Sequence, residues 1–182
     1  MIRRIQRYAE SHPLAFVMMV GGLFRLIAAI FSQGYGMHDD HFLIIEAAQS
    51  WVDDYDYNNW LPENRPNQNP GGHSLFYVGL HYALFSFLDM FSFLTPKANM
   101  FIVRLLHAAY SLLIILFGYK ITRNLTDTKT AKQVGLVLAL FWVMPNLSVR
   151  NLVEFTCIPP LMAATWFLRS EERRVGKECR SR

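Results

Sequence analysis

Apolar residues along the chain fall into five blocks separated by polar stretches. The blocks cover residues 14–31, 73–94, 100–121, 133–149 and 152–168. Most of them approach the roughly 20 residues that a helix needs to cross a bilayer, whereas a soluble domain alternates apolar and polar positions at periods of 3.6 or 2. The pattern therefore predicts an all-α fold: a polytopic membrane helical bundle with about five transmembrane segments.

Composition agrees with this class of protein. Of the 182 residues, 52% are hydrophobic and only 18% are charged, and the mean hydropathy of +0.16 averages very apolar blocks with very polar ones. The net charge of +4 indicates no nucleic-acid partner, because no basic face is interleaved with aromatic residues. The two cysteines, Cys157 and Cys179, define no disulfide framework. We expect membrane lipids to surround the chain.

The first apolar block has a basic start, with Arg3, Arg4 and Arg7, and we interpret it as a retained signal anchor. The positive-inside bias places this end in the cytoplasm. Residues 32–72, which hold seven acidic residues and one basic residue, then form the first outward loop. We expect a multi-pass integral membrane protein of the bacterial inner membrane, with its site on the outer, periplasmic face.

One connector conflicts with this orientation. If all five segments cross once, residues 122–132 also lie outside, yet the basic residues in and beside this connector favour the cytoplasm. These residues are Lys120, Arg123, Lys129 and Lys132. A segment that does not fully cross the membrane resolves the conflict.

The first span carries two features that bear on packing. Gly21 and Gly22 allow close approach of a neighbouring helix. Arg25 is costly in lipid, so we expect it to have a partner. Further along, we expect Asp89 and Arg104 to pair across the short connector between two spans, and Pro159 and Pro160 to break the last one. The Phe and Leu positions of the second and third spans are interpreted as lipid-facing or packing residues.

The outward loop begins with the segment MHDDHFLIIEAAQSW. Its Ile44, Ala47, Ala48 and Trp51 follow the spacing i, i+3, i+4, i+7, which predicts an amphipathic helix on the membrane surface. The second half of the loop is dense in Asn, Asp, Pro and Gly, and therefore predicts turns and irregular structure.

Two adjacent carboxylates, Asp39 and Asp40, stand at the start of this helix. Aspartate is favoured in the first turn, where it faces the positive end of the helix dipole. The same field keeps the carboxylate ionised, as a general base must be. Helix capping and catalysis are therefore both compatible with this pair.

His38 and His41 flank the two carboxylates. Four consecutive residues cannot all point at one ion, so we predict no metal site. Hydrogen bonding to a phosphate or a sugar suits the histidines better. Arg65 and His73, at the end of the loop, are further candidates for holding an anionic group, although surface residues of these types often serve only solubility.

The order of these features resembles the GT-C superfamily of membrane glycosyltransferases. The resemblance is carried by MHDDHFLIIEAAQSW, by NQNPGGHSLFYVGLHYALFSFL and by MFIVRLLHAAYSLLIILFGYKITRNL. The HDD triplet is similar to the His-Pro-Asp-Glu motif of the Alg9-like and phosphatidylinositol-glycan mannosyltransferases (family 22). Arg150, Asn151 and Glu154 in VRNLVEF resemble their later Ser-Asn-x-x-Glu motif. The chain departs from these motifs because no proline separates His38 from Asp39, and Leu152 interrupts the later match. A family 39-like enzyme is the alternative.

The resemblance implies an inverting transfer of a hexose such as mannose from a polyprenyl-phosphate donor to a lipid, glycan or protein acceptor. Asp39, with Asp40 as the second candidate, corresponds to the catalytic base, and no cofactor is implied. The remaining candidates are assigned to substrate binding: His38, His41, Glu46, Arg65, His73, Arg104, Arg150 and Glu154.

The resemblance covers residues 1–170, which we interpret as the N-terminal part of a GT-C transmembrane domain. We interpret residues 171–182, EERRVGKECRSR, as a non-native tail, and expect such a fragment to be inactive by itself. The alternative function is a transporter or channel subunit in which Arg25, Asp89 and Arg104 line a path with Glu154. That class predicts inverted repeats, which the five blocks do not contain. A membrane anchor with a sensory loop leaves the charges within the helices unexplained.

Overall fold

The computed structural model describes residues 2–34, 38–61, 74–91 and 94–180. Every regular element within these ranges is helical, which confirms the all-α prediction. The elements are α1 (Ile2–Ser11), α2 (Pro13–Phe31), α3 (His38–Asp40), the π-helix η1 (His41–Glu46), α4 (Ala47–Val52), α5 (Leu75–Asp89), α6 (Pro96–Leu125), α7 (Thr128–Leu140), α8 (Val143–Ser148) and α9 (Val153–Arg180).

Two helices in the described part of the chain, α2 and α6, are long and apolar enough to cross a membrane. They have 19 and 30 residues and each begins with a proline, whose missing N–H costs nothing at a helix start. Thr95 caps α6, since its Oγ1 accepts a hydrogen bond from the backbone N–H of Ala98 at 3.3 Å. The predictions for residues 14–31 and 100–121 are confirmed as membrane-length helices.

Helices α2, α6 and α7 pack around a core of Val17, Ile115 and Ala139, all fully buried. A Cβ added at Gly21 would overlap Ile115 Cδ1, whereas one added at Gly22 would meet nothing within 4 Å. Gly21 alone therefore serves the close helix contact that the sequence predicted for both glycines.

Arg25 lies inside this bundle with 1% of its surface exposed. Its Nε donates to Ser111 Oγ at 2.9 Å, while Nη1 and Nη2 donate to the carbonyl oxygens of Gly21 at 3.3 Å and Leu138 at 3.4 Å. The expected partners are thus a hydroxyl and two carbonyls rather than a carboxylate. These bonds tie α2 to α6 and α7.

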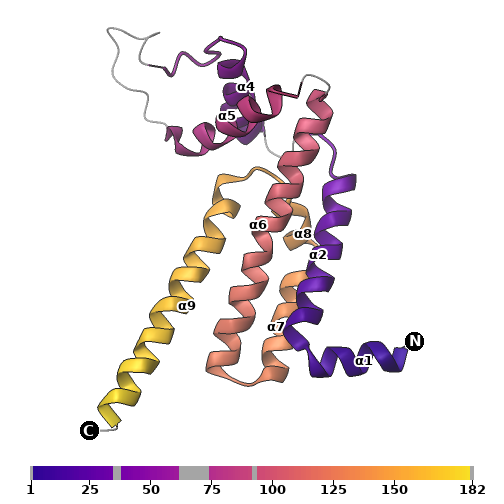
Figure 1. The fold of residues 1–182 in the computed structure, drawn as a ribbon, viewed down its shortest axis with the longest axis vertical. Coiled ribbons are helices and arrows are strands. Elements are labelled where there is room, and N and C mark those ends of the chain that lie inside the picture. The colour runs from indigo at the N-terminus through magenta and orange to yellow at the C-terminus, as the bar shows by residue number, and fades with distance from the viewer. Residues whose placement is uncertain (1, 35–37, 62–73, 92–93, 181–182) are drawn as a thin grey trace.

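The predicted span at residues 73–94 is not confirmed as a membrane-length helix. Helix α5 has 15 residues, about 22 Å, which is short of the roughly 30 Å hydrocarbon core. Figure 1 shows α4 and α5 lying together across one end of the long helices. Ile44, Ala47 and Ala48 are buried in the cluster that also contains Val78 and Phe85 of α5. The amphipathic pattern was correct, but α5 covers the apolar face.

The fourth and fifth apolar blocks also differ from the prediction. Helix α7 stops at Leu140 after 13 residues, and the short α8 follows. Helix α9 runs unbroken through Pro159 and Pro160. Proline removes a hydrogen bond to the carbonyl four residues earlier, and the Thr156 carbonyl opposite Pro160 instead accepts a bond from the Tyr110 hydroxyl at 3.1 Å. The predicted break is therefore wrong.

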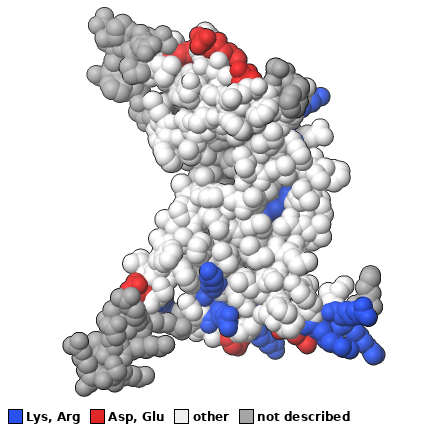
Figure 2. Space-filling model, viewed as in Figure 1, with Lys and Arg blue, Asp and Glu red and all other residues white. Residues whose placement is uncertain are grey.

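Charge is unevenly spread along the long axis of the molecule. Figure 2 shows most Lys and Arg at the end that carries α1 and the α6–α7 turn, with some Asp and Glu among them, and a group of Asp and Glu over α4 at the opposite end. Because α5 does not run the length of the bundle, residues 122–132 return to the end that holds Arg3, Arg4 and Arg7. The basic residues of this connector therefore lie at the same end as the basic start of the chain.

Candidate functional site

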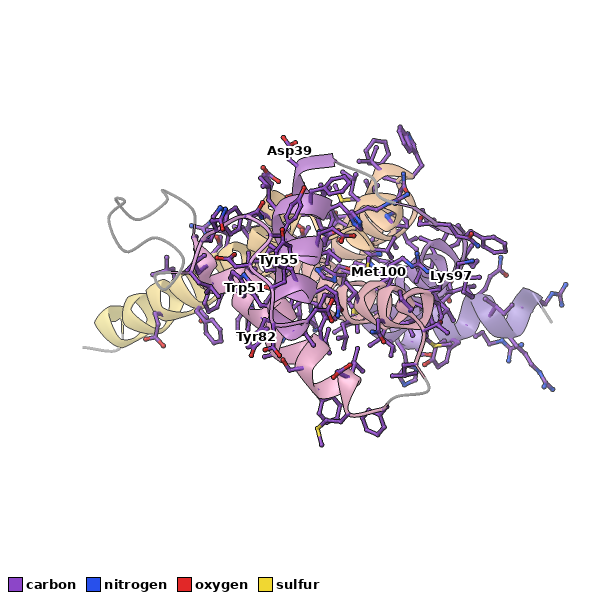
Figure 3. The ribbon with its side chains drawn as sticks, turned by 90° about the horizontal axis from the view of Figure 1, so that it is seen from above. Asp39, Trp51, Tyr55, Tyr82, Lys97 and Met100 are labelled. Atoms are coloured by element: carbon purple, nitrogen blue, oxygen red, sulfur yellow. The ribbon has the colours of Figure 1, made fainter. Side chains whose placement is uncertain are left out.

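Asp39 and Asp40 lie at the start of a continuous helical run from residue 38 to residue 52. Asp39 is exposed and Asp40 is half-buried. Seen along the bundle axis, Asp39 lies at one end of this run, and Trp51 lies near Tyr55 and Tyr82 at the other (Figure 3). The two carboxylates therefore stand apart from the aromatic side of the α4–α5 layer.

Both aspartates line a cavity of about 510 Å³ between this layer and the long helices. Figure 2 shows the surface hollowed between the two parts. A cavity of this size falls in the range of small-molecule sites. It is lined by Asp39, Asp40, Leu43, Ile44, Trp60, Ser74, Phe76, Tyr77, Val78, Tyr110, Val153, Thr156, Cys157 and Pro160. Most of these side chains are apolar or aromatic, so the carboxylates form a polar edge on an apolar hollow.

Asp40 is fixed by the start of α9. Its carboxylate accepts a hydrogen bond from the backbone N–H of Val153, the first residue of that helix. Asn151 Nδ2 donates to the Asp40 carbonyl oxygen at 2.8 Å, across 111 positions of sequence. Glu154 is close enough to act on Asp40 electrostatically. The fold thus brings the HDD segment and the VRNLVEF segment together.

The surroundings of Asp40 disfavour its charged form. Burial raises the pKa of the Asp40 carboxyl, and the neighbouring Glu154 and Asp39 carboxylates raise this pKa further. The hydrogen bond from Val153 acts in the opposite direction. Asp40 therefore ionises less readily than an ordinary aspartate.

Asp39 also borders a second recess of about 350 Å³, lined by Phe42, Leu43, Tyr57 and Asn58. It is the more solvent-accessible carboxylate and faces both hollows. Among the residues that the structure describes, no group of three or more His, Cys, Asp or Glu could hold a metal ion.

His41 and Glu46 pair with each other, with 3.1 Å between Nε2 and Oε1. The π-helical winding of η1 explains this contact, because its hydrogen bonds join residues five apart and so align positions 41 and 46. Short π segments occur frequently at functional sites. Neither side chain lines the large cavity.

Arg104 and Arg150 hold the segment that follows α2. Their Nη1 atoms donate to the carbonyl oxygens of Ser32 at 2.9 Å and Gly34 at 2.6 Å. Arg104 does not pair with Asp89, and that prediction is wrong. Arg104, near the start of α6, bonds the Ser32 carbonyl instead. Both arginines border a small recess of about 20 Å³ that also touches His41 and Asn151.

Sequence reasoning missed a polar chain on the cavity wall. The Tyr77 hydroxyl lies 2.6 Å from His107 Nε2, and Thr156 Oγ1 donates to that hydroxyl at 3.2 Å. His107 Nδ1 lies 2.8 Å from the Val103 carbonyl, which can only accept, so Nε2 accepts from Tyr77. The chain links α5, α6 and α9. The sequence held one signal of this chain, because His81 and His107 are histidines within apolar blocks. In the structure, His81 Nδ1 also lies 2.9 Å from the Tyr77 carbonyl oxygen.

The large cavity continues into an apolar hollow of about 420 Å³. The two share four residues: Phe76, Tyr77, Tyr110 and Thr156. The predicted site residues Arg65 and His73, and the side chain of His38, lie outside the described residues.

Comparison with known proteins gives one match. A model of the Alg9-like mannosyltransferase family matches residues 16–173, which is most of the chain and includes both motif segments. No curated protein and no solved structure matches. The two membrane-length helices fit a membrane glycosyltransferase. With its HDD segment joined to the start of α9 beside an apolar cavity, this chain belongs to the Alg9-like mannosyltransferase family.

Proposed function

We propose that the protein transfers a hexose such as mannose from a polyprenyl-phosphate donor to an acceptor hydroxyl at the outer face of its membrane. The observation that carries this proposal is the position of Asp39 and Asp40 on the edge of an apolar cavity of about 510 Å³. A sugar linked to a lipid needs both parts: polar groups at the reacting carbon and an apolar surface for the chain.

Asp39 is the proposed base. Its exposed carboxylate takes the proton of the acceptor hydroxyl while the hydroxyl oxygen attacks the anomeric carbon. The bond from that carbon to the phosphate oxygen breaks, and its electron pair leaves with the polyprenyl phosphate. Attack from the face opposite the leaving group inverts the anomeric configuration. Asp40 suits this role less well, because its carboxylate is half-buried and engaged by Val153 N–H.

The donor fits the two joined hollows. Phe76, Tyr77 and Tyr110 line both, so one apolar surface extends from the carboxylates along α5, α6 and α9. The leaving phosphate needs nearby positive charge or hydrogen-bond donors rather than a proton. His38, Arg65 and His73 stay the phosphate partners proposed from the sequence. His41, Arg104 and Arg150 border a separate small recess.

The outward orientation follows from charge. The basic α1 and the α6–α7 turn share one end of the bundle, and the carboxylates lie at the other (Figure 2). Positive residues favour the cytoplasmic side. We therefore place Asp39 and Asp40 on the outer face.

The test is transfer of mannose by the full-length enzyme, reconstituted in lipid, from polyprenyl-phosphate mannose to an oligosaccharide acceptor. Loss of a general base lowers the rate by roughly 100-fold to 10,000-fold, so we expect Asp39→Asn to lose activity in this range while still accumulating in the membrane. Asp54→Asn is the matched control, because Asp54 is exposed, borders none of the four cavities described, and its positive φ of 56° suits asparagine. Normal transfer by Asp39→Asn contradicts the assignment.

Occupancy of the cavity can be measured without turnover. Cys157 is an exposed free thiol on the cavity wall. In a Cys179→Ser background, we expect polyprenyl phosphate to slow maleimide labelling of Cys157, and a single-cysteine Ser170→Cys, Cys157→Ser variant to label at an unchanged rate. Equal labelling of Cys157 with and without the lipid contradicts the proposed donor site.

A further inference from the structure

Helix α1 has an apolar side that the rest of the described chain leaves uncovered. Ala9 is 5% exposed and packs toward the body of the protein, whereas Ile5 is 48% exposed and Tyr8 is 42% exposed. At 100° per residue, Ile5 and Tyr8 share one side of the helix and Arg3 and Arg7 share the other. Helix α1 is thus strongly amphipathic.

The position of α1 favours a bilayer surface. Figure 1 shows α1 lying across the end of α2, which is one of the two membrane-length helices. His12 and Pro13 form the corner, and the backbone N–H of His12 still bonds the Tyr8 carbonyl at 2.8 Å. A helix held across the end of a membrane-spanning helix lies in the plane of the headgroups.

The charges of α1 fit an anionic partner. Arg3, Arg4 and Arg7 are exposed, and none of them forms an ion pair with a residue that the structure describes. Further basic side chains stand at the same end: Lys132 lies 5.5 Å above the Phe16 ring, and Lys120 lies 4.6 Å above the Trp166 ring. Figure 2 shows Lys and Arg in excess at this end, with Asp and Glu between them.

We propose that α1 is a binding surface for the headgroups of anionic membrane lipids. Ile5 and Tyr8 enter the boundary between headgroups and acyl chains, and the three arginines bind lipid phosphates through charge-assisted hydrogen bonds. Attraction of a basic side chain to an anionic surface strengthens binding about fivefold per residue. This surface is independent of the proposed sugar transfer, which uses the opposite end of the molecule.

The test follows the environment of α1 in the full chain. An Ile5→Cys variant in a Cys157→Ser, Cys179→Ser background carries a polarity-sensitive fluorophore and is placed in nanodiscs of phosphatidylcholine, with or without phosphatidylglycerol. We expect phosphatidylglycerol to shift the emission to the blue and to lower quenching by a soluble quencher at least fivefold. High salt reverses both effects. The same label at Gln6→Cys, on the polar side, stays accessible in both lipids.

Charge removal supplies the decisive comparison. Combining Arg3→Gln, Arg4→Gln and Arg7→Gln abolishes the response to phosphatidylglycerol, whereas Lys97→Gln, at the opposite end of the bundle, leaves it unchanged. A label at position 5 that stays exposed in both lipids overturns the proposal. So does a label that is buried equally in both lipids, because α1 then packs on an apolar surface without regard to lipid charge.

Discussion

Two neighbouring carboxylates of this protein have different surroundings. Asp40 is half-buried, bonded to Val153 N–H and close to Glu154, whereas Asp39 is exposed and faces two hollows. Helix capping is therefore the role seen for Asp40, and catalysis is the role proposed for Asp39. Asp40 caps α9, a helix more than 100 positions further along the chain, and Asp39 presents its carboxylate to the cavity.

The raised pKa of Asp40 gives a testable pH effect. Glu154 contributes to the raised pKa by charge repulsion, so Glu154→Gln should lower the pKa of Asp40 toward its ordinary value. Carbon-13 NMR of the aspartate carboxyl groups in micelles measures the midpoint. Glu46→Gln is the control, because Glu46 pairs with His41 and does not act on Asp40. An Asp40 midpoint unchanged by Glu154→Gln contradicts the electrostatic contact.

The raised pKa of Asp40 also determines how the stability of the folded protein changes with pH. A carboxyl whose pKa is raised by folding contributes stability that is fully present below the pKa of the unfolded chain. This contribution is lost as pH rises through the higher pKa of the folded state. Wild-type protein should therefore lose more thermal stability than Asp40→Asn as pH rises through the range above the usual aspartate pKa.

The charged candidate residues and the motif segments could be identified from the sequence, but the contacts between side chains of different helices could not. Asp39, Asp40 and Glu154 were found because charges beside apolar blocks are rare. Tyr77 and Thr156 were missed because an aromatic or hydroxyl residue in an apolar block is usually packing. Only the crossing of α5 over α9 places their hydroxyl oxygens 3.2 Å apart.

At the scale of elements, one glycine of α2 is packed closely against α6. Gly21 is in the tightest contact, and its carbonyl also accepts the bond from Arg25 Nη1. A Cβ added at Gly22, the next residue, would meet no described atom within 4 Å. The two glycines therefore form a matched pair for measuring the contact.

We expect Gly21→Ala to destabilise the bundle by about 1–3 kcal/mol, because the new methyl group must displace the fully buried Ile115. Gly22→Ala should be neutral or stabilise by up to about 1 kcal/mol, since alanine favours a helix more than glycine does. The free energy of unfolding in mixed micelles measures both. Equal effects of the two substitutions contradict the packing.

Helix α5 shows why an apolar block is not always a span. Residues 73–94 form an apolar block like those of α2 and α6, but α5 uses Val78, Phe85 and Leu88 to pack on the α4 layer. Hydropathy indicates only that a side chain avoids water. It does not distinguish a side chain packed inside the protein from one exposed to lipid. The sequence left open a segment that does not fully cross, and the length and position of α5 make it the candidate for that segment.

At the scale of the whole molecule, the number of crossings decides where each connector lies. With α5 across the end, α2 runs from the α1 end toward the carboxylates and α6 returns. Residues 122–132 then share a side with α1. The charge pattern and the helix arrangement agree, although neither was used to derive the other.

A labelling experiment distinguishes this topology from one with five crossings, because the two place the α6–α7 turn on opposite sides of the membrane. In a Cys157→Ser, Cys179→Ser background, Tyr55→Cys reports the α4–α5 layer and Thr128→Cys reports the α6–α7 turn; both positions are exposed. With a membrane-impermeant maleimide on intact cells, we expect Tyr55→Cys to label and Thr128→Cys to label only after permeabilisation. Five crossings predict that both label on intact cells, because an α5 that spans the membrane returns the α6–α7 turn to the outside. Labelling of both positions on intact cells would therefore reject the arrangement in which α5 lies across the end of the bundle.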